Sequence, residues 1–404
     1  MPSELARHWD LDPAIRFLNH GSYGATPRTV LVAQRAWRDR MEREPVAFLA
    51  RELEPAMDAA REELAAFVGA AASGMAFVHN ASTAIATVLG SLHLAPGDEL
   101  LTTDHAYNAV KNQMERVAAQ AGARVVIARV PFPGATPDGA AEAILAAASS
   151  RTRLAVLDHV TSATALSFPI RELVAELDAR GIDTLVDGAH APGMLPLDVD
   201  AIGAAFYAAN CHKWLCAPKG SGFLHVRDDR RDLIRPLVIS HGATSPRTDR
   251  SRFHLEFDWT GTDDPTAYLA VPDAIRFGAD LLPGGWPALY ERNRSLAIAA
   301  RDLLCDALAE PEPAEDGMLG AMASVPVPSG SGAPTRDTGL LYDEPLHASL
   351  IDRGIQVAIA RWPRRADGGP SRRLVRVSAA TYNDIDDMRA LAEALRELVA
   401  RPAA

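Results

Sequence analysis

Short runs rich in β-branched residues alternate with longer runs rich in Ala, Leu and Glu between residues 75 and 226. The strand-like segment 75–79, for example, is followed by the helix-like segment 82–94. The expected strands lack a clean period-two alternation of apolar and polar residues, which indicates that both strand faces are buried. Strands that alternate with helices in this way favour a mainly parallel sheet covered by helices. We therefore expect an α/β fold.

The same alternation predicts the remaining elements of this region. The further strands are expected at 98–104, 124–130, 153–160, 182–190, 205–211 and 220–226. The further helices are expected at 108–122, where Gly122 ends the helix, and at 138–149 and 169–181.

The pattern breaks at the sequence PGGWP, residues 283–287. A long helix is expected over 289–310, and the Pro-, Gly- and Ser-rich stretch 311–337 after it is expected to be rich in loops. Strand-like and helical pieces then continue to the end. We expect three parts, which are an N-terminal segment, a large domain and a smaller C-terminal α+β domain, over residues 1–20, 21–285 and 286–404.

Composition narrows the class of protein. The chain has 404 residues, of which 48% are hydrophobic, and this suits a globular protein with a large core. The formal net charge is -11 and no strong basic stripe is present, so nucleic acid is not an expected partner. Three cysteines without framework spacing indicate a reducing compartment. Since no signal peptide and no membrane-length apolar run is seen, we expect a cytoplasmic protein that has no membrane partner.

A lysine and an aspartate are the first candidates for chemistry. Lys213 lies in the largely apolar stretch AANCHKWLCAPKGSGF, residues 208–223, and Asp187 ends the strand-like sequence IDTLVD. Ligands of open parallel sheets bind at the carboxyl ends of the strands. A lysine amine and an acid suit pyridoxal phosphate, which forms a Schiff base with the amine and needs a protonated ring nitrogen. A capping Asp187 and a solvated surface Lys213 are the alternatives.

Two turns offer hydroxyl groups for the cofactor phosphate. Asn80, Ser82 and Thr83 stand where a strand passes into a helix, and free N–H groups at a helix start bind anions. A second turn surrounds Gly261 and Thr262. An ordinary helix cap and an ordinary β-turn are the alternatives for these two segments.

With these segments in view, the chain resembles the class V aminotransferase family of fold type I pyridoxal phosphate enzymes, within the isopenicillin N epimerase-like branch. The resemblance implies a large domain with a mainly parallel sheet of the seven-stranded type and a smaller C-terminal domain. The matching segments run in family order along nearly the whole chain: FLNHGSYGATP (17–27), HNAST (79–83), DHAYNAV (104–110), HVTSATAL (159–166), DGAHAPG (187–193), NCHKWLCAPKGSGFL (210–224), WTGTDDPTA (259–267) and LVRVSAATYN (374–383).

The resemblance implies a role for each matching residue around the cofactor ring. Lys213 forms the Schiff base and later moves protons, and Asp187 pairs with the ring nitrogen. His105 stacks on the ring face away from Lys213. His190 lies near the phenolic oxygen, together with Ser162.

The resemblance also implies how the phosphate and the substrate are held. Thr262 reaches the phosphate of the neighbouring subunit, so the active unit is expected to be a homodimer. Arg376 receives the α-carboxylate of an amino-acid substrate, for which a planar guanidinium is well matched. Within one subunit the phosphate is held by Ser82, Thr83, Asn210 and His212.

Several reactions are compatible with this cofactor. Epimerisation needs proton delivery on both faces of Cα, for which Lys213 and Tyr107 are the candidates, with His20 and Tyr23 behind them. Elimination by a carbon–sulfur lyase needs one face and an acid, which Tyr107 also supplies. The resemblance favours an amino-acid epimerase, with the lyase second and a non-catalytic binding protein of the same fold third. Transamination is a further outcome.

Two further alternatives are less favoured. Persulfide-forming desulfuration usually needs a reactive cysteine in the C-terminal part, and residues 306–404 contain none. A metal site is not expected, since Cys211 and Cys216 are more typical of small apolar groups beside Lys213. The arginine-rich segments 247–252 and 361–373 are candidates for gripping a distal carboxylate, and a solvated surface is the alternative.

Overall fold

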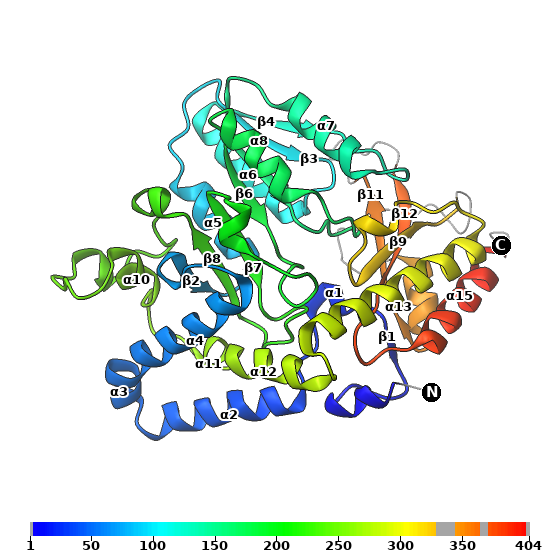
Figure 1. The fold of residues 1–404 in the computed structure, drawn as a ribbon, viewed down its shortest axis with the longest axis horizontal. Coiled ribbons are helices and arrows are strands. Elements are labelled where there is room, and N and C mark those ends of the chain that lie inside the picture. The colour runs from blue at the N-terminus through cyan, green and yellow to red at the C-terminus, as the bar shows by residue number, and fades with distance from the viewer. Residues whose placement is uncertain (1–2, 329–343, 364–370, 401–404) are drawn as a thin grey trace.

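The computed structural model describes residues 3–328, 344–363 and 371–400. Its centre is a seven-stranded sheet (Figure 1). The strands are β2 (Met75–Val78), β3 (Glu99–Thr103), β4 (Arg124–Ala128), β5 (Thr152–Asp158), β6 (Asp183–Asp187), β7 (Phe206–Asn210) and β8 (Gly222–Val226).

The strand order is β2-β8-β7-β6-β5-β3-β4. The pairs from β7 through β4 are parallel, and β8 is antiparallel to both of its neighbours. The predicted mainly parallel α/β sheet is thus confirmed, and each predicted strand lies within two or three residues of an observed one. Because β5, β6 and β7 are parallel, their carboxyl ends meet at one edge of the sheet, where ligands of such sheets bind.

Helices cover both faces of the sheet, which explains why its strands are apolar on both sides. One face packs against α5 (Ala81–Ser91), α6 (Asn108–Ala121) and α10 (Arg252–Phe257). The opposite face packs against α4 (Leu53–Val68), α7 (Pro137–Ala147), α8 (Ile170–Ala179) and α12 (Val271–Leu281).

Local signals fix the ends of several of these helices. The Asn80 side chain accepts a hydrogen bond from the Thr83 amide and so caps the start of α5. Gly122 ends α6 in the left-handed conformation, with φ of 69°, as its position in the sequence predicted. Short elements fill the connections: η1 (Glu4–His8), α3 (Pro45–Ala47), η2 (Phe48–Glu52), η3 (Ala72–Gly74), α9 (Val199–Ile202), η4 (Asp228–Leu233), η5 (His241–Thr244) and α11 (Thr266–Leu269).

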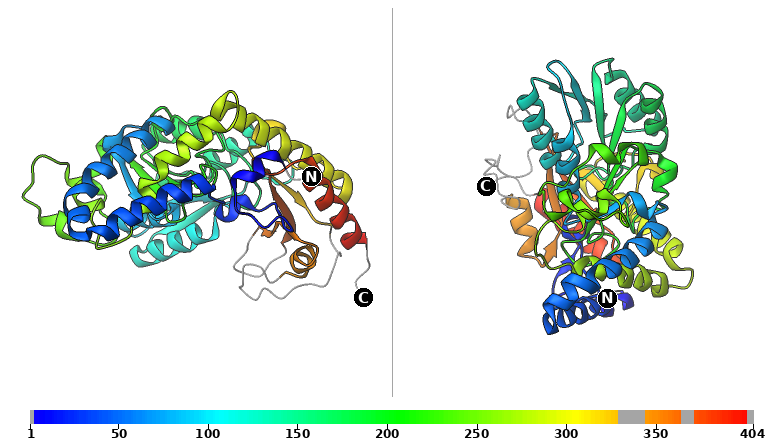
Figure 2. Two further views of the ribbon diagram at one scale, coloured as in Figure 1. Left: turned by 90° about the horizontal axis from the view of Figure 1, so that it is seen from below. Right: turned by 90° about the vertical axis from the view of Figure 1, so that its left-hand side faces the viewer.

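The C-terminal part forms a second core at one end of the large domain (Figure 2). It holds an antiparallel three-stranded sheet in the order β11 (Ala358–Trp362), β12 (Arg372–Ser378) and β9 (Met322–Pro326). Three helices pack around it: α13 (Gly285–Leu308), α14 (Pro345–Ile351) and α15 (Ile385–Ala400).

The expectation of a loop-rich stretch at 311–337 needs correction. It contains η6 (Asp316–Met318) and β9, whose five residues are all buried. The strand forms because Met322, Ala323 and Val325 are apolar and pair with β12, and Pro326 occupies only its last position. Residues 329–337 lie outside the described part of the chain.

The N-terminal residues connect the two cores. β1 (Arg16–Phe17) pairs in parallel with β10 (Ile355–Gln356) of the C-terminal part, and α1 (His20–Tyr23) and α2 (Arg28–Arg43) follow. The division at residues 20 and 285 stays a prediction, although α13 does begin at Gly285.

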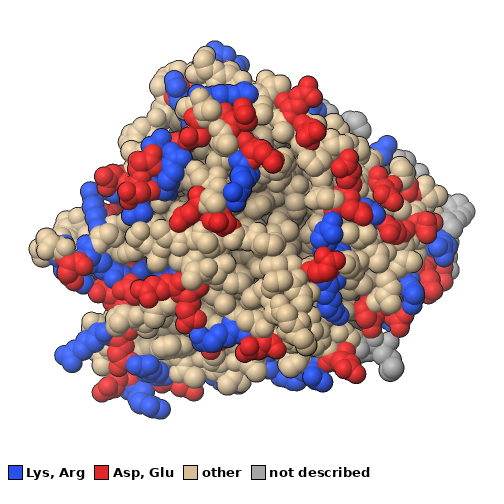
Figure 3. Space-filling view, viewed as in Figure 1, with Lys and Arg blue, Asp and Glu red and all other residues tan. Residues whose placement is uncertain are grey.

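Acidic and basic side chains are interspersed over the face shown in Figure 3. Much of this charge is paired, as in the ion pairs of Arg227 with Asp178 and of Arg230 with Asp183. Among the helices of the described ranges, none has the length and the apolar character that a membrane crossing requires. The expected compartment stays a prediction.

Candidate active site

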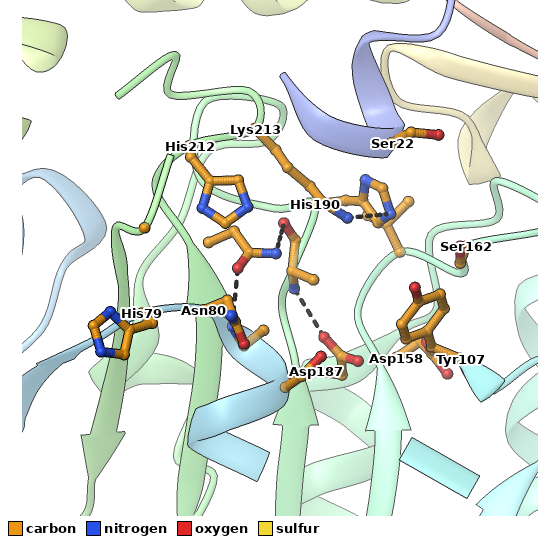
Figure 4. A pocket seen from close by; sticks show the side chains of 16 residues that line it. Ser22, His79, Asn80, Tyr107, Asp158, Ser162, Asp187, His190, His212 and Lys213 are labelled. Carbon is orange, nitrogen blue, oxygen red and sulfur yellow. Dashed lines mark hydrogen bonds between the residues drawn. The ribbon is translucent and has the colours of Figure 1, made fainter. Parts of the chain in front are cut away.

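A cavity of about 330 Å³ opens at the carboxyl edge of the sheet, above β5, β6 and β7 (Figure 4). Eight residues predicted for the site line it: Ser82, Tyr107, Ser162, Asp187, His190, Asn210, His212 and Lys213. The other lining residues are Ser22, His79, Asn80, Ala81, Asp158, Val160, Ala189 and Gly220.

The Lys213 amine lies in this cavity, in the loop after β7. Its Nζ is 3.3 Å from Nε2 of His190 (Figure 4). Burial, followed by the charge of Arg376, lowers the pKa of Lys213 to about 7, although the charge of Asp187 opposes the shift. A large fraction of the amine is therefore neutral and nucleophilic near pH 7.

His190 is held on the side away from the lysine. Its Nδ1 accepts a hydrogen bond of 3.4 Å from Nε1 of Trp214. Burial, followed by the charge of Lys213, lowers the pKa of His190 well below its usual value. A neutral His190 whose Nδ1 accepts carries its proton on Nε2, so this N–H points at the Lys213 amine.

The N-terminal segment packs against the loop that carries Lys213. The Lys213 carbonyl accepts a hydrogen bond of 3.0 Å from Nε2 of His20, whose Nδ1 lies 2.8 Å from the Tyr382 hydroxyl. Gly24 has φ of 69°, and a Cβ there would overlap the His212 carbonyl. His20 is buried and outside the cavity lining, so its place is structural.

Two neighbouring strands end in buried carboxylates under the cavity. Asp187 ends β6, and its Oδ1 accepts a hydrogen bond of 3.0 Å from the Ala189 amide. Asp158 ends β5 directly beside it. Burial raises the pKa of Asp187, and burial together with the charge of Asp187 raises the pKa of Asp158. A positively charged group above this pair relieves the cost of burying negative charge.

The start of α5 forms the other end of the cavity. The Asn210 Oδ1 accepts a hydrogen bond of 2.8 Å from the Ala81 amide, and the Thr83 hydroxyl donates to Asn80. Thr83 is outside the cavity lining, whereas Ser82 lines it and is exposed. The amides of Ala81 and Thr83 are thus already paired, and Ser82 is the residue of this helix start that faces the cavity, at a position where a helix N-terminus favours an anion.

His212 lies at the same end of the cavity as the start of α5. Its Nδ1 donates a hydrogen bond of 2.9 Å to the Ser221 carbonyl, and the ring lines the cavity. Burial lowers the pKa of His212 to about 4, so its ring is neutral before an anion binds.

The expectation that His105 stacks on the cofactor needs correction. Its ring is buried outside the cavity, with Nδ1 2.6 Å from the Thr164 hydroxyl and Nε2 donating to the Val130 carbonyl at 2.9 Å. The ring also packs against Trp362, with centroids 4.8 Å apart. Tyr107, two residues later, is the ring of this segment that lines the cavity and is 45% exposed.

Arg376 lies behind the cavity, on β12. Its guanidinium donates to the Ser162 carbonyl at 2.7 Å, to the Ser22 hydroxyl at 2.9 Å and to Oδ1 of Asn19 at 3.3 Å. Ser22 and Ser162 line the cavity, so these two residues stand between the arginine and the space. Its role toward a substrate carboxylate stays a prediction.

Thr262 is exposed and is outside the cavity lining of its own chain. The next residue, Asp263, lies 3.1 Å from Nε2 of His79, which lines the cavity. The turn that carries Thr262 is therefore close to the cavity mouth.

The arginine-rich segment 247–252 is paired within the protein. Arg247 binds Glu54 at 2.7 Å, and Arg250 binds Asp58 at 2.8 Å and also Asp258. These contacts favour a structural role over substrate binding. Of the second segment, residues 364–370 lie outside the described part of the chain.

Asp158, Ser22 and His79 are cavity residues that the sequence reasoning missed. A signal existed for Asp158, because the strand-like sequences RLAVLD and IDTLVD both end in aspartate and were predicted to be parallel. The segment 17–27 that contains Ser22 was matched to the family, and His20 and Tyr23 were named from it as candidates, but Ser22 itself was not.

Comparisons with known proteins agree with this architecture. Residues 26–275 match the family model Aminotransferase class-V. The chain is 38% identical to isopenicillin N epimerase of Amycolatopsis lactamdurans, over 96% of each protein. It is 33% identical to a putative L-cysteine desulfhydrase 2 of Oryza sativa subsp. japonica, over 98% of this chain and 87% of the relative.

Solved structures share the fold at lower sequence identity. The cystine C-S lyase C-DES, in complex with cysteine persulfide, matches with a TM-score of 0.78 and 21% identity, over 95% of this chain and 97% of that chain. The cysteine desulfurase CsdA from Escherichia coli matches with a TM-score of 0.76 and 21% identity, over 98% and 97%. The chain therefore belongs to the class-V aminotransferase family, whose fold type I implies pyridoxal phosphate as the cofactor.

Proposed function

We propose that this chain is an amino-acid epimerase of the isopenicillin N epimerase-like kind, which inverts the α-carbon of an amino-acid substrate. The observation that carries the proposal is that an amine and a phenol enter one cavity from different loops, Lys213 after β7 and Tyr107 after β3. The identity of 38% over almost the full chain to an isopenicillin N epimerase supports the same reaction.

The residues present fit pyridoxal phosphate. Lys213 offers a partly neutral amine for covalent attachment, and the carboxylate pair below it accommodates a protonated ring nitrogen at Asp187. The start of α5, with Ser82 and His212, accommodates the phosphate. When bound, pyridoxal phosphate supplies an electron sink that weakens the Cα–H bond of an attached amino acid.

The chain's own residues then have separate tasks. Asp187 keeps the ring nitrogen charged, and His190 and Ser162 surround the phenolic oxygen. Lys213 removes the Cα proton on one side. Tyr107 returns a proton on the other, which inverts the centre. Arg376 orients the substrate carboxylate, after exchange of its contacts to Ser22 and Ser162.

A carbon–sulfur lyase is the second candidate. The 33% identity to a putative L-cysteine desulfhydrase over 98% of the chain favours it. The same two groups serve this reaction: Lys213 removes the Cα proton, and Tyr107 protonates the departing sulfur. The two reactions differ in the atom that receives the proton from Tyr107.

We also propose that the active unit is a homodimer in which Thr262 reaches the phosphate of the neighbouring subunit. Two observations support it. Thr262 is exposed, and Trp259 in the same turn lines an apolar cavity of about 410 Å³ together with Pro45, Val46, Leu49 and Ala50. Exposed apolar surface of this kind is typical of subunit contacts.

The reaction is tested by supplying the purified, cofactor-loaded protein with peptide-like amino acids and with cysteine and its conjugates. Chiral chromatography measures inversion, and a thiol assay measures release of sulfur. We expect inversion without loss of mass from the substrate. Release of hydrogen sulfide from cysteine, or of a thiol from a conjugate, together with pyruvate and ammonia and without inversion of any substrate, would instead identify the lyase.

The pKa of Lys213 predicts how cofactor incorporation depends on pH. The amine attacks only when neutral, so the rate of incorporation into cofactor-free protein should rise through pH 7 and level off about one unit above. Stopped-flow absorbance of the visible band measures it. Lys213→Ala should show no borohydride-stable adduct, and a midpoint near the ordinary lysine value of about 10.4 would contradict the assignment of a lowered pKa.

Tyr107→Phe tests the second proton. The change removes one hydroxyl from an exposed ring, so the protein should fold normally. Exchange of the Cα proton with solvent deuterium should persist through Lys213, while inversion falls by about 10²- to 10⁴-fold. Tyr290→Phe, a tyrosine on α13 outside the cavity lining, is the control and should change neither. Unchanged inversion in Tyr107→Phe would remove this residue from the reaction.

Thr262→Ala tests the shared site. Light scattering should give a dimer mass for both the wild type and the variant, while the affinity of the variant for pyridoxal phosphate falls by about tenfold through loss of one hydrogen bond to a charged group. Ser245→Ala, in the exposed loop after η5, is the control. An active monomer would rule out the shared site.

A further inference from the structure

Asp158 lies beside Asp187 at the base of the cavity and has no task in the reaction described above. The two residues are paired directly in the parallel register of β5 and β6. Neighbouring strands lie about 4.8 Å apart, and paired residues point to the same face of a sheet. Both carboxyls line the same cavity, and the residues are only 4% and 6% exposed (Figure 4).

Two carboxylates this close in a buried site do not both stay charged, because each disfavours the ionised form of the other. Asp187 has the better support for its charge, since it accepts the Ala189 amide at 3.0 Å and lies near the Lys213 amine. Burial, followed by the charge of Asp187, raises the pKa of Asp158 well above its usual value, and the backbone amides of Asp158 and Tyr107 and the charge of Lys111 on α6 oppose this shift only in part. The proton therefore belongs on Asp158.

We propose that Asp158 is a positioning residue that keeps a proton, donates it in a hydrogen bond to the Asp187 carboxylate, and accepts the Tyr107 amide on its other oxygen. The inference rests on the proposed function, because it assigns Asp187 to the cofactor ring nitrogen. Asp158 then contacts both Asp187 and the backbone of Tyr107. It stabilises the charge that faces the ring nitrogen, and it fixes the backbone of the residue that supplies the second proton.

The neutral, hydrogen-bonding state of Asp158 is distinguishable from a charged one. If Asp158 were ionised, its charge would help to hold the cationic ring, and any neutral replacement would weaken cofactor binding. If Asp158 is protonated, an amide replaces it well, since asparagine is neutral, of equal size and has both a donor and an acceptor. A side chain without a donor would leave Asp187 unsupported, and Asp187 would then take up the proton itself and lose its charge.

The test compares Asp158→Asn with Asp158→Leu, which has similar size and no polar atom. Two readouts are used: the dissociation constant of pyridoxal phosphate from absorbance titration, and the ¹⁵N chemical shift of the ring nitrogen with labelled cofactor. We expect Asp158→Asn to bind within about threefold of the wild type and to keep a protonated ring nitrogen. We expect Asp158→Leu to bind about 10- to 100-fold more weakly, the range for losing a hydrogen bond to a charged group, and to shift the nitrogen signal toward the unprotonated form.

Asp183→Asn is the matched control. Asp183 is the first residue of β6, the strand that ends at Asp187. It lies at the opposite end of that strand from the cavity and pairs with Arg230 at 2.8 Å. It should change neither readout. Thermal melting checks the folding of each variant, and Asp158→Ala replaces the leucine variant if that one does not fold.

Two results overturn the inference alone. Binding by Asp158→Asn as weak as that of the leucine variant would show that the charge is required. Wild-type binding and a wild-type nitrogen signal in the leucine or alanine variant would show that Asp158 positions nothing. A wild-type chain that binds no pyridoxal phosphate overturns the proposed function and this inference with it.

Discussion

The burial of charge at the carboxyl edge of the sheet is the constraint on which the site depends. One amine, two carboxyls and one guanidinium lie in or beside the cavity and are largely buried, namely those of Lys213, Asp158, Asp187 and Arg376. Burial disfavours the charged forms of the amine and of the two carboxyl groups, and the charges of neighbouring groups add to or oppose these pKa shifts. The arrangement leaves a nearly neutral amine above a carboxylate pair that is short of positive charge. Such a site is completed by a cationic ring with an anionic tail, and the start of α5 supplies the place for the tail.

The second core and the N-terminal segment hold this arrangement together. The loop that carries Lys213 makes backbone hydrogen bonds within itself, from the Cys216 amide to the Lys213 carbonyl and from the Ala217 amide to the Cys211 carbonyl, and contacts from outside the large sheet hold it as well. His20 binds the Lys213 carbonyl, and its other ring nitrogen meets Tyr382 near the end of β12. Arg376 on β12 reaches Ser162 after β5. Both links therefore join the C-terminal part to loops at the carboxyl edge of the large sheet.

The sequence was sufficient for the sheet and for the residues that end its strands. Alternating apolar runs predicted the β/α order, and Lys213 and Asp187 followed from the rule that ligands bind where parallel strands end. The sequence was insufficient where the path of a turn determines which side chain faces the cavity. His105 and Tyr107 are two residues apart, and only the path after β3 determines that the tyrosine faces the cavity while the histidine packs on Trp362. Likewise, the sequence does not show that Arg247 and Arg250 are paired, because their partners Glu54 and Asp58 lie far earlier in the chain, on α4.

Under the proposed function, the choice between inversion and elimination depends on which substrate atom the Tyr107 hydroxyl can contact. Tyr107 caps the start of α6 and has no side-chain cap bond there, so its ring is oriented by the backbone before it. That backbone belongs to the short connection between β3 and α6, and the proposed contact with Asp158 on β5 would hold it in place. A phenol fixed at the height of Cα returns a proton to Cα, whereas one displaced toward Cβ meets a leaving group first. Under the proposed function, the two reactions would therefore diverge at the contacts around residues 104–108, while the amine, the carboxylate and the anion site would serve both.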